Sequence, residues 1–89
     1  MPTLKQVAQV LNWQIPRDMH VNLFTDVISV RTGLCSKGSR LVLKVSYDHK
    51  HSKWRVWTPY GYNAEFNWLS DALDKARTLS NKQRALELA

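Results

Sequence analysis

The chain has 89 residues, the size of one small domain, and its 13 lysines and arginines against seven acidic residues give a formal net charge of +6 at pH 7. A chain this short buries a modest core and leaves little volume for a deep active-site cavity, so its length favours binding over catalysis. No apolar run reaches the roughly 18 residues that a membrane-spanning helix needs, and a single cysteine excludes an internal disulfide, so we expect a soluble, cytoplasmic protein with no membrane association.

The first 32 residues predict one helix and one strand. Thr3 can cap a helix over about 3 to 13, in which apolar residues recur at three- and four-residue spacing: Leu4, Val7, Ala8 and Leu11. The segment Val21 to Thr32 is rich in β-branched residues and alternates as a strand does. Alternation places on one face Phe24, Asp26, Ile28 and Val30, and on the other Val27, Ser29 and Arg31. Because Asp26 interrupts an apolar face, the strand proper is expected to start after it.

An antiparallel hairpin is the strongest local pattern. Arg40 to Tyr47 and Lys53 to Thr58 alternate and are joined by a polar turn at 48–52, while Gly33 to Ser39 has the composition of a loop. The alternation predicts an apolar face made of Leu41, Leu43, Val45, Tyr47, Trp54 and Val56. It predicts a basic face made of Arg40, Val42, Lys44, Ser46, Lys53, Arg55 and Trp57.

The last predicted element is a helix over Phe66 to Leu79. Its apolar stripe consists of Leu69, Ala72, Leu73, Ala76 and Leu79, and it should lie across the apolar face of the sheet. Residues 80–89 are expected either to continue this helix or to fray. The sequence therefore predicts a single α+β domain over 1–89, with a core at about 3–79. It comprises an N-terminal helix, a three-stranded antiparallel sheet and a C-terminal helix packed on one sheet face.

The net charge is localised between Arg31 and Arg55. Seven bases in this stretch face one acid, Asp48, and the rest of the chain is neutral overall. Lysine and arginine neutralise phosphates, and tryptophan can stack on an unpaired base. We therefore predict a small nucleic-acid-binding protein, with DNA favoured over RNA, whose candidate contacts are Arg31, Lys37, Arg40, Lys44, Lys50, Lys53, Arg55 and Trp57. The alternating bases also fit a merely solvated outer sheet face.

Aromatic residues are concentrated between Trp54 and Trp68. The expected core members are Trp54, Phe66 and Trp68, and the expected exposed members are Trp57, Tyr60 and Tyr62. Exposed aromatics beside arginine are also typical of protein-binding hot spots. An alternative function is therefore a protein-binding module, such as a compact inhibitor of the type that phages encode, docked on an acidic partner surface. An exposed Trp57 or an unpaired edge strand equally suits a homodimer.

Two histidines lie in the predicted hairpin turn. His49 and His51 have only Cys35 as a further soft ligand, so the sequence predicts no metal site and no cofactor. A third hypothesis is a small ribonuclease of the toxin type, in which one histidine acts as general base and Lys53 with Arg55 clamps the phosphate.

The predicted architecture resembles known nucleic-acid-binding domains. The order of helix, three strands and helix is similar to the double-stranded RNA-binding domain, although that family's lysine cluster at the start of the last helix is replaced here by Ser70, Asp71 and Asp74. A three-stranded sheet backed by one helix, over about Asp26 to Leu79, resembles the plant-type AP2 domain and the arm-binding domain of tyrosine integrases. This architectural resemblance implies that DNA would be read from the sheet face by Arg40, Lys44, Arg55 and Trp57.

Overall fold

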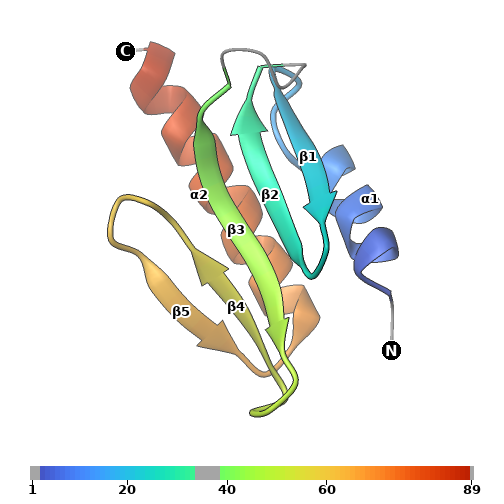
Figure 1. The fold of residues 1–89 in the computed structure, drawn as a ribbon. Coiled ribbons are helices and arrows are strands. Elements are labelled where there is room, and N and C mark those ends of the chain that lie inside the picture. Colours follow the sequence, from blue (N-terminus) through green and yellow to red (C-terminus); the bar gives the residue numbers. More distant parts are fainter. Residues whose placement is uncertain (1–2, 34–38, 89) are drawn as a thin grey trace.

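The computed structural model describes residues 3–33 and 39–88, with side chains up to residue 86. The elements run in the order α1 (Leu4–Gln14), β1 (Met19–Phe24), β2 (Val27–Thr32), β3 (Leu41–Asp48), β4 (Lys53–Trp57), β5 (Asn63–Phe66) and α2 (Leu69–Leu88) (Figure 1). Each strand pairs antiparallel with the next, which gives one five-stranded sheet in sequence order. The α+β fold with a helix at each end is confirmed. The predicted three-stranded sheet is wrong in its number of strands.

The first additional strand arises because the predicted single strand is a hairpin. Thr25 and Asp26 reverse the chain between β1 and β2, with Thr25 in the left-handed region at φ 55°. This turn contains Asp26, a residue that turns favour, but it has no glycine, proline or asparagine to mark it more strongly in the sequence. Phe24 therefore pairs with Val27 and lies on the face opposite Ile28, contrary to the predicted alternation.

The second additional strand, β5, is short and follows residues that usually interrupt strands. It has four residues and comes after Pro59 and Gly61, and Gly61 adopts a φ of +99° in the turn from β4. Thr58 closes this turn, because its backbone N–H donates to the carbonyl of Tyr62 at 2.9 Å. Phe66, predicted as the first residue of the last helix, instead ends β5 and pairs with Trp54.

A β-bulge in β3 changes which side chains face the helices. Val30 pairs with Leu43 and Arg31 with Leu41, so Val42 is the extra residue between the two pairs. Val42 is only 2% exposed and lines an apolar groove together with side chains of α2. The predicted positions of Leu41 on the apolar face and Val42 on the basic face are therefore both wrong.

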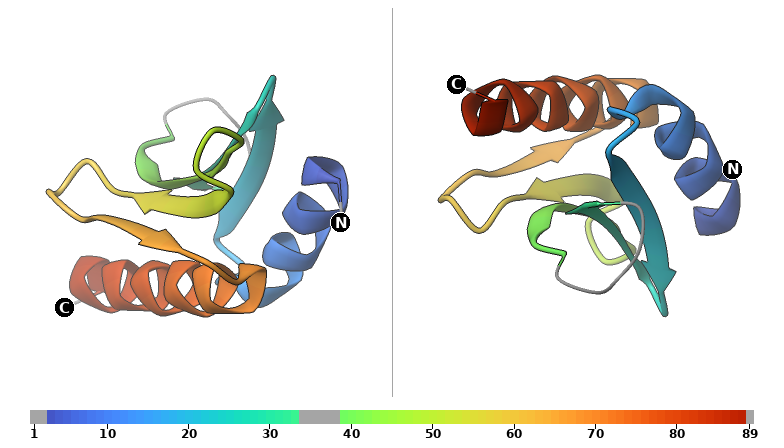
Figure 2. Two further views of the ribbon diagram at one scale, coloured as in Figure 1. Left: turned by 90° about the horizontal axis from the view of Figure 1, so that it is seen from below. Right: turned by 90° about the horizontal axis from the view of Figure 1, so that it is seen from above.

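The two helices pack on the same side of the twisted sheet (Figure 2). Helix α1 lies beside β1, and α2 lies along β3, β4 and β5. The core between them is apolar: Val7, Leu11, Ile15, Met19, Ile28, Val30, Val42, Leu43, Val45, Trp54, Val56, Ala72 and Ala76. Burial of these side chains is the main force that holds the layers together.

Helix α1 begins as the sequence predicts. The Thr3 hydroxyl oxygen accepts a hydrogen bond from the backbone N–H of Gln6 at 3.2 Å, and the Gln6 side-chain oxygen accepts one from the backbone N–H of Thr3 at 2.9 Å. This reciprocal capping box satisfies two backbone donors that the first helical turn leaves without partners.

Helix α2 continues to Leu88, so the residues from 80 onward extend the helix. The Nε atom of Arg84, in this extension, lies 3.1 Å from a carboxylate oxygen of Asp18 in the segment between α1 and β1. This ion pair connects the end of α2 to the segment between α1 and β1. Neither described helix combines the length and the apolar character needed to cross a membrane.

Candidate functional site

The sheet face opposite the two helices is named the outer face. Both described helices lie on the other side of the sheet, so no helix covers it (Figure 2). Its side chains come from alternate positions of the five strands: His20, Asn22, Phe24, Val27, Ser29, Arg31, Leu41, Lys44, Ser46, Asp48, Lys53, Arg55, Trp57, Asn63 and Glu65.

The strand register arranges these side chains in rows across the sheet. One row contains Phe24, Val27, Ser46, Arg55 and Glu65. The adjacent row contains Asn22, Ser29, Lys44, Trp57 and Asn63. Lys44 therefore occupies the centre of the outer face, on the middle strand and in the middle of its row.

Two cations of the outer face are not paired with a carboxylate. The Nζ atom of Lys44 lies 5.4 Å from the centroid of the Trp57 ring, which is within cation–π range. Arg31 donates from Nε to the hydroxyl of Ser39 at 3.1 Å. Among residues 3–33 and 39–86, no carboxylate forms an ion pair with Lys44 or Arg31. Both charges are therefore available to an anionic ligand.

Two other cations are partly compensated by acids. A terminal guanidinium nitrogen of Arg55 lies 2.9 Å from Glu65 and 3.6 Å from Asp48, and Lys53 stands opposite Asp48 in the register. The outer face thus carries four bases and two acids, a net charge of +2 with histidine neutral. The positive electrostatic field of the outer face is therefore weaker than the net charge of +6 between Arg31 and Arg55 would produce.

Asp48 organises the turn that follows β3. One of its carboxylate oxygens lies 2.7 Å from Nδ1 of His51, and the other accepts from the backbone N–H groups of Lys50 at 3.0 Å and His51 at 3.3 Å. The side-chain hydrogen bond from His51 is the largest of the effects that hold the pKa of Asp48 below its ordinary value. Within the described part of the chain, no three His, Cys, Asp or Glu residues are grouped so as to hold a metal ion.

Five of the eight predicted nucleic-acid contacts share the outer face: Arg31, Lys44, Lys53, Arg55 and Trp57. Arg40 precedes β3, where its backbone N–H donates to the Thr32 hydroxyl at 3.0 Å, so it lies outside the strand register that defines the outer face. Lys50 lies in the turn after β3. Lys37 and Cys35 fall outside the described residues.

The aromatic residues divide differently from the prediction. Trp54 is buried and Phe66 packs against the core, as expected, whereas Trp68 is 70% exposed and is not a core residue. Tyr60 and Tyr62 lie toward α2 and line the same groove as Val42, which has a volume of about 480 Å³. Neither tyrosine therefore stands beside Trp57 on the outer face.

Phe24 is the residue of the outer face that the sequence prediction missed. It is 79% exposed at the end of β1, and Trp57 is 38% exposed on β4. The continuous alternation from Val21 to Thr32 assigned Phe24 to the apolar face. Recognising the turn at Thr25 and Asp26 would have placed Phe24 on the opposite face, together with Val27.

Two shallow hollows lie next to each other on the outer face. The larger, of about 410 Å³, is lined by Phe24, Thr25, Asp26, Val27, Ser29, Arg31 and Lys44. The smaller, of about 240 Å³, is lined by Val27, Lys44, Ser46, Arg55, Trp57 and Asn63. Val27 and Lys44 belong to both, so the two hollows form one continuous surface across the sheet.

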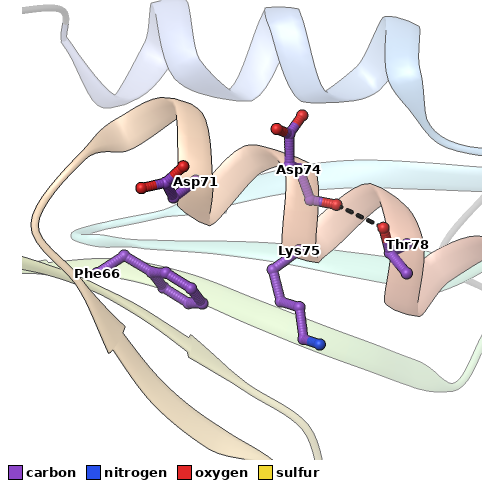
Figure 3. A pocket seen from close by; sticks show the side chains of 5 residues that line it. All are labelled: Phe66, Asp71, Asp74, Lys75 and Thr78. Atoms are coloured by element: carbon purple, nitrogen blue, oxygen red, sulfur yellow. Dashed lines mark hydrogen bonds between the residues drawn. The ribbon is translucent and has the colours of Figure 1, made fainter.

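A different hollow, of about 370 Å³, lies between the end of β5 and the first turns of α2 (Figure 3). Asp71, Asp74 and Lys75 supply its charged groups, and the hydroxyl of Thr78 donates to the backbone carbonyl of Asp74 at 2.9 Å. Two carboxylates against one ammonium group make this hollow unsuitable for an anionic ligand.

Comparison of the chain with models of protein families, with curated proteins and with solved structures gives no match. Among the described residues, the outer face differs from the other surfaces in the charged and aromatic side chains that it brings together. It combines two cations without an ion pair, two further cations and two exposed aromatic rings on one sheet face.

Proposed function

We propose that the protein binds nucleic acid through the outer face. The observation that carries this proposal is the position of Lys44, an unpaired cation at the centre of an uncovered sheet face, with Arg31 on the neighbouring strand and Trp57 beside it. Phosphates would balance the excess positive charge of this surface, and bases or sugars would supply apolar surface that packs on the Trp57 ring. The proposal covers DNA and RNA, with DNA as the first polymer to test.

The charge arrangement sets the expected salt dependence. Lys44 and Arg31 are free of carboxylates, whereas Lys53 and Arg55 share Asp48 and Glu65. Neutralising about three phosphates predicts a loss of affinity of roughly 20- to 40-fold when salt rises from about 50 to 200 mM.

The test is fluorescence anisotropy of labelled duplex DNA, single-stranded DNA and RNA at low and high salt. Lys44→Glu should weaken binding by roughly tenfold or more, because it places a negative charge next to the bound phosphates. Lys5→Glu is the matched control, since it makes the same change in net charge at an exposed position of α1. An equal loss in both variants would assign the effect to overall charge and refute the outer face as the site.

The alternatives are outcomes of the same experiment. If none of the three polymers binds at low salt, the proposal fails, and a basic face that docks on an acidic protein becomes the better explanation. The labelled RNA is also run on a denaturing gel after the titration, because His51 beside Asp48 is the candidate general base of a ribonuclease. Cleavage that His51→Ala abolishes would establish that third function.

A further inference from the structure

We propose that the outer face is built for a single strand, with one base stacked on Phe24, another on Trp57, and the backbone between them running over Lys44. This inference rests on the proposed function and specifies the form of nucleic acid that is bound. It is carried by the two neighbouring hollows, which no sequence pattern predicts.

The two hollows contain the same kinds of groups. Each has an exposed aromatic ring, a guanidinium and a serine hydroxyl: Phe24, Arg31 and Ser29 in the larger hollow, and Trp57, Arg55 and Ser46 in the smaller. A ring that stacks on a base, a cation that binds a phosphate and a hydroxyl that reaches a base edge or sugar are the groups with which proteins hold unpaired nucleotides. Two such sets form two similar subsites, of which the larger also contains the carboxylate of Asp26.

Lys44 lies where the two subsites meet. It lines both hollows, and among the described residues its ammonium group lies near the Trp57 ring and forms no ion pair with a carboxylate. A single point charge shared by two base-sized subsites suits the phosphate backbone that connects the two stacked bases. Asn63, in the smaller hollow only, adds an amide that can both donate to and accept from a base edge.

The separation of the strands that carry the two rings does not match the spacing of bases in a duplex. Phe24 is on β1 and Trp57 on β4, three strand spacings apart, which corresponds to about 14 Å. Bases stacked in duplex DNA are about 3.4 Å apart along each strand. Adjacent paired bases therefore cannot reach both rings, whereas bases splayed from a single strand can.

Exposure of Phe24 also fits a stacking role. Burying a phenylalanine side chain favours folding, yet this ring is 79% exposed to solvent. The turn at Thr25, in the left-handed conformation, reverses the chain at this point and gives Phe24 its position on the outer face. A bound base would cover the ring.

The experiment compares one sequence as single-stranded DNA, single-stranded RNA and duplex DNA, with labelled oligonucleotides in anisotropy titrations. The wild-type protein should bind the single strands at least about tenfold more tightly than the duplex. Phe24→Ala and Trp57→Ala should each weaken single-strand binding by roughly 5- to 150-fold, the cost of one lost stack, with the salt slope unchanged. Trp57→Phe should retain most of the affinity, because it keeps an aromatic ring.

The chain offers matched controls and separable failures. Trp13→Ala and Trp68→Ala remove equally large exposed rings from other surfaces and should leave binding unchanged. Salt-dependent binding of duplex and single strand with equal affinity, insensitive to Phe24→Ala and Trp57→Ala but reduced by Lys44→Glu, would overturn the stacking inference and leave the proposed function standing. Absence of binding to every polymer would overturn both.

Discussion

Removal of the Ser80 hydroxyl should make the protein more stable. Ser80 is fully buried in α2, and its Oγ atom has no hydrogen-bond partner among the described residues. A buried polar group without a partner costs about 1–3 kcal/mol, and alanine is favoured over serine in a helix interior by about 0.5 kcal/mol. After allowing for the packing that the oxygen provides, Ser80→Ala should raise the free energy of unfolding by about 1–2 kcal/mol.

Urea denaturation followed by circular dichroism measures this change, and thermal unfolding should show a rise of about 4–8 °C for each kcal/mol in a domain of this size. Asn81→Ala is the control, because the neighbouring position is exposed and gains only helix propensity. If Ser80→Ala is no more stable than the wild type while Asn81→Ala is, the hydroxyl has a partner in solution and the packing of α2 described above is wrong.

Four further substitutions test three other features of the fold. Val42→Asp should lower the free energy of unfolding by about 3 kcal/mol or more, and Leu41→Asp by less than about 1 kcal/mol, because the bulge buries only the former; equal losses in urea would contradict the bulge. The lowered pKa of Asp48 means that its carboxylate stabilises the fold above its ordinary pKa of about 3.9, and this stabilisation disappears as pH falls through the lowered folded-state pKa. The stability difference between the wild type and Asp48→Asn should therefore shrink in urea titrations below about pH 4, and a constant difference would contradict the bond to His51. Gly61→Ala should cost about 1 kcal/mol in thermal unfolding, since the φ of +99° strains a side chain even though no atom lies within 4 Å of the new Cβ; no change would show that the turn relaxes.

Local patterns predicted the elements whose signals are carried by many residues. Helix α1 was located to within a residue at each end, because its apolar spacing and the capping Thr3 act within one segment. The β3–β4 hairpin was also correct, since two alternating strands flank a polar turn. The apolar stripe that begins at Leu69 identified the body of α2.

The errors occur where local signals are weak or ambiguous. Leu41, Val42 and Leu43 are all apolar, so their sequence is compatible with either register and cannot reveal a bulge. The turn at Thr25 and Asp26 contains no glycine or proline, and the alternation of strand residues continues on both sides of it. Trp68 has the size of a core residue, but its position just before α2 leaves it in solvent.

The sequence predicted which charged residues the candidate site contains, but it did not predict how the site is arranged. The sequence alone determined that basic residues concentrate between Arg31 and Arg55 and that Lys44, Arg55 and Trp57 share one strand face, because alternation within a hairpin is a local property. Only the tertiary structure placed Phe24 on that face, left Arg40 outside the paired strand and placed Glu65 against Arg55. Those positions depend on the turn between β1 and β2, the bulge in β3 and the pairing of β4 with β5, and each of these forms through contacts between strands that no single strand contains.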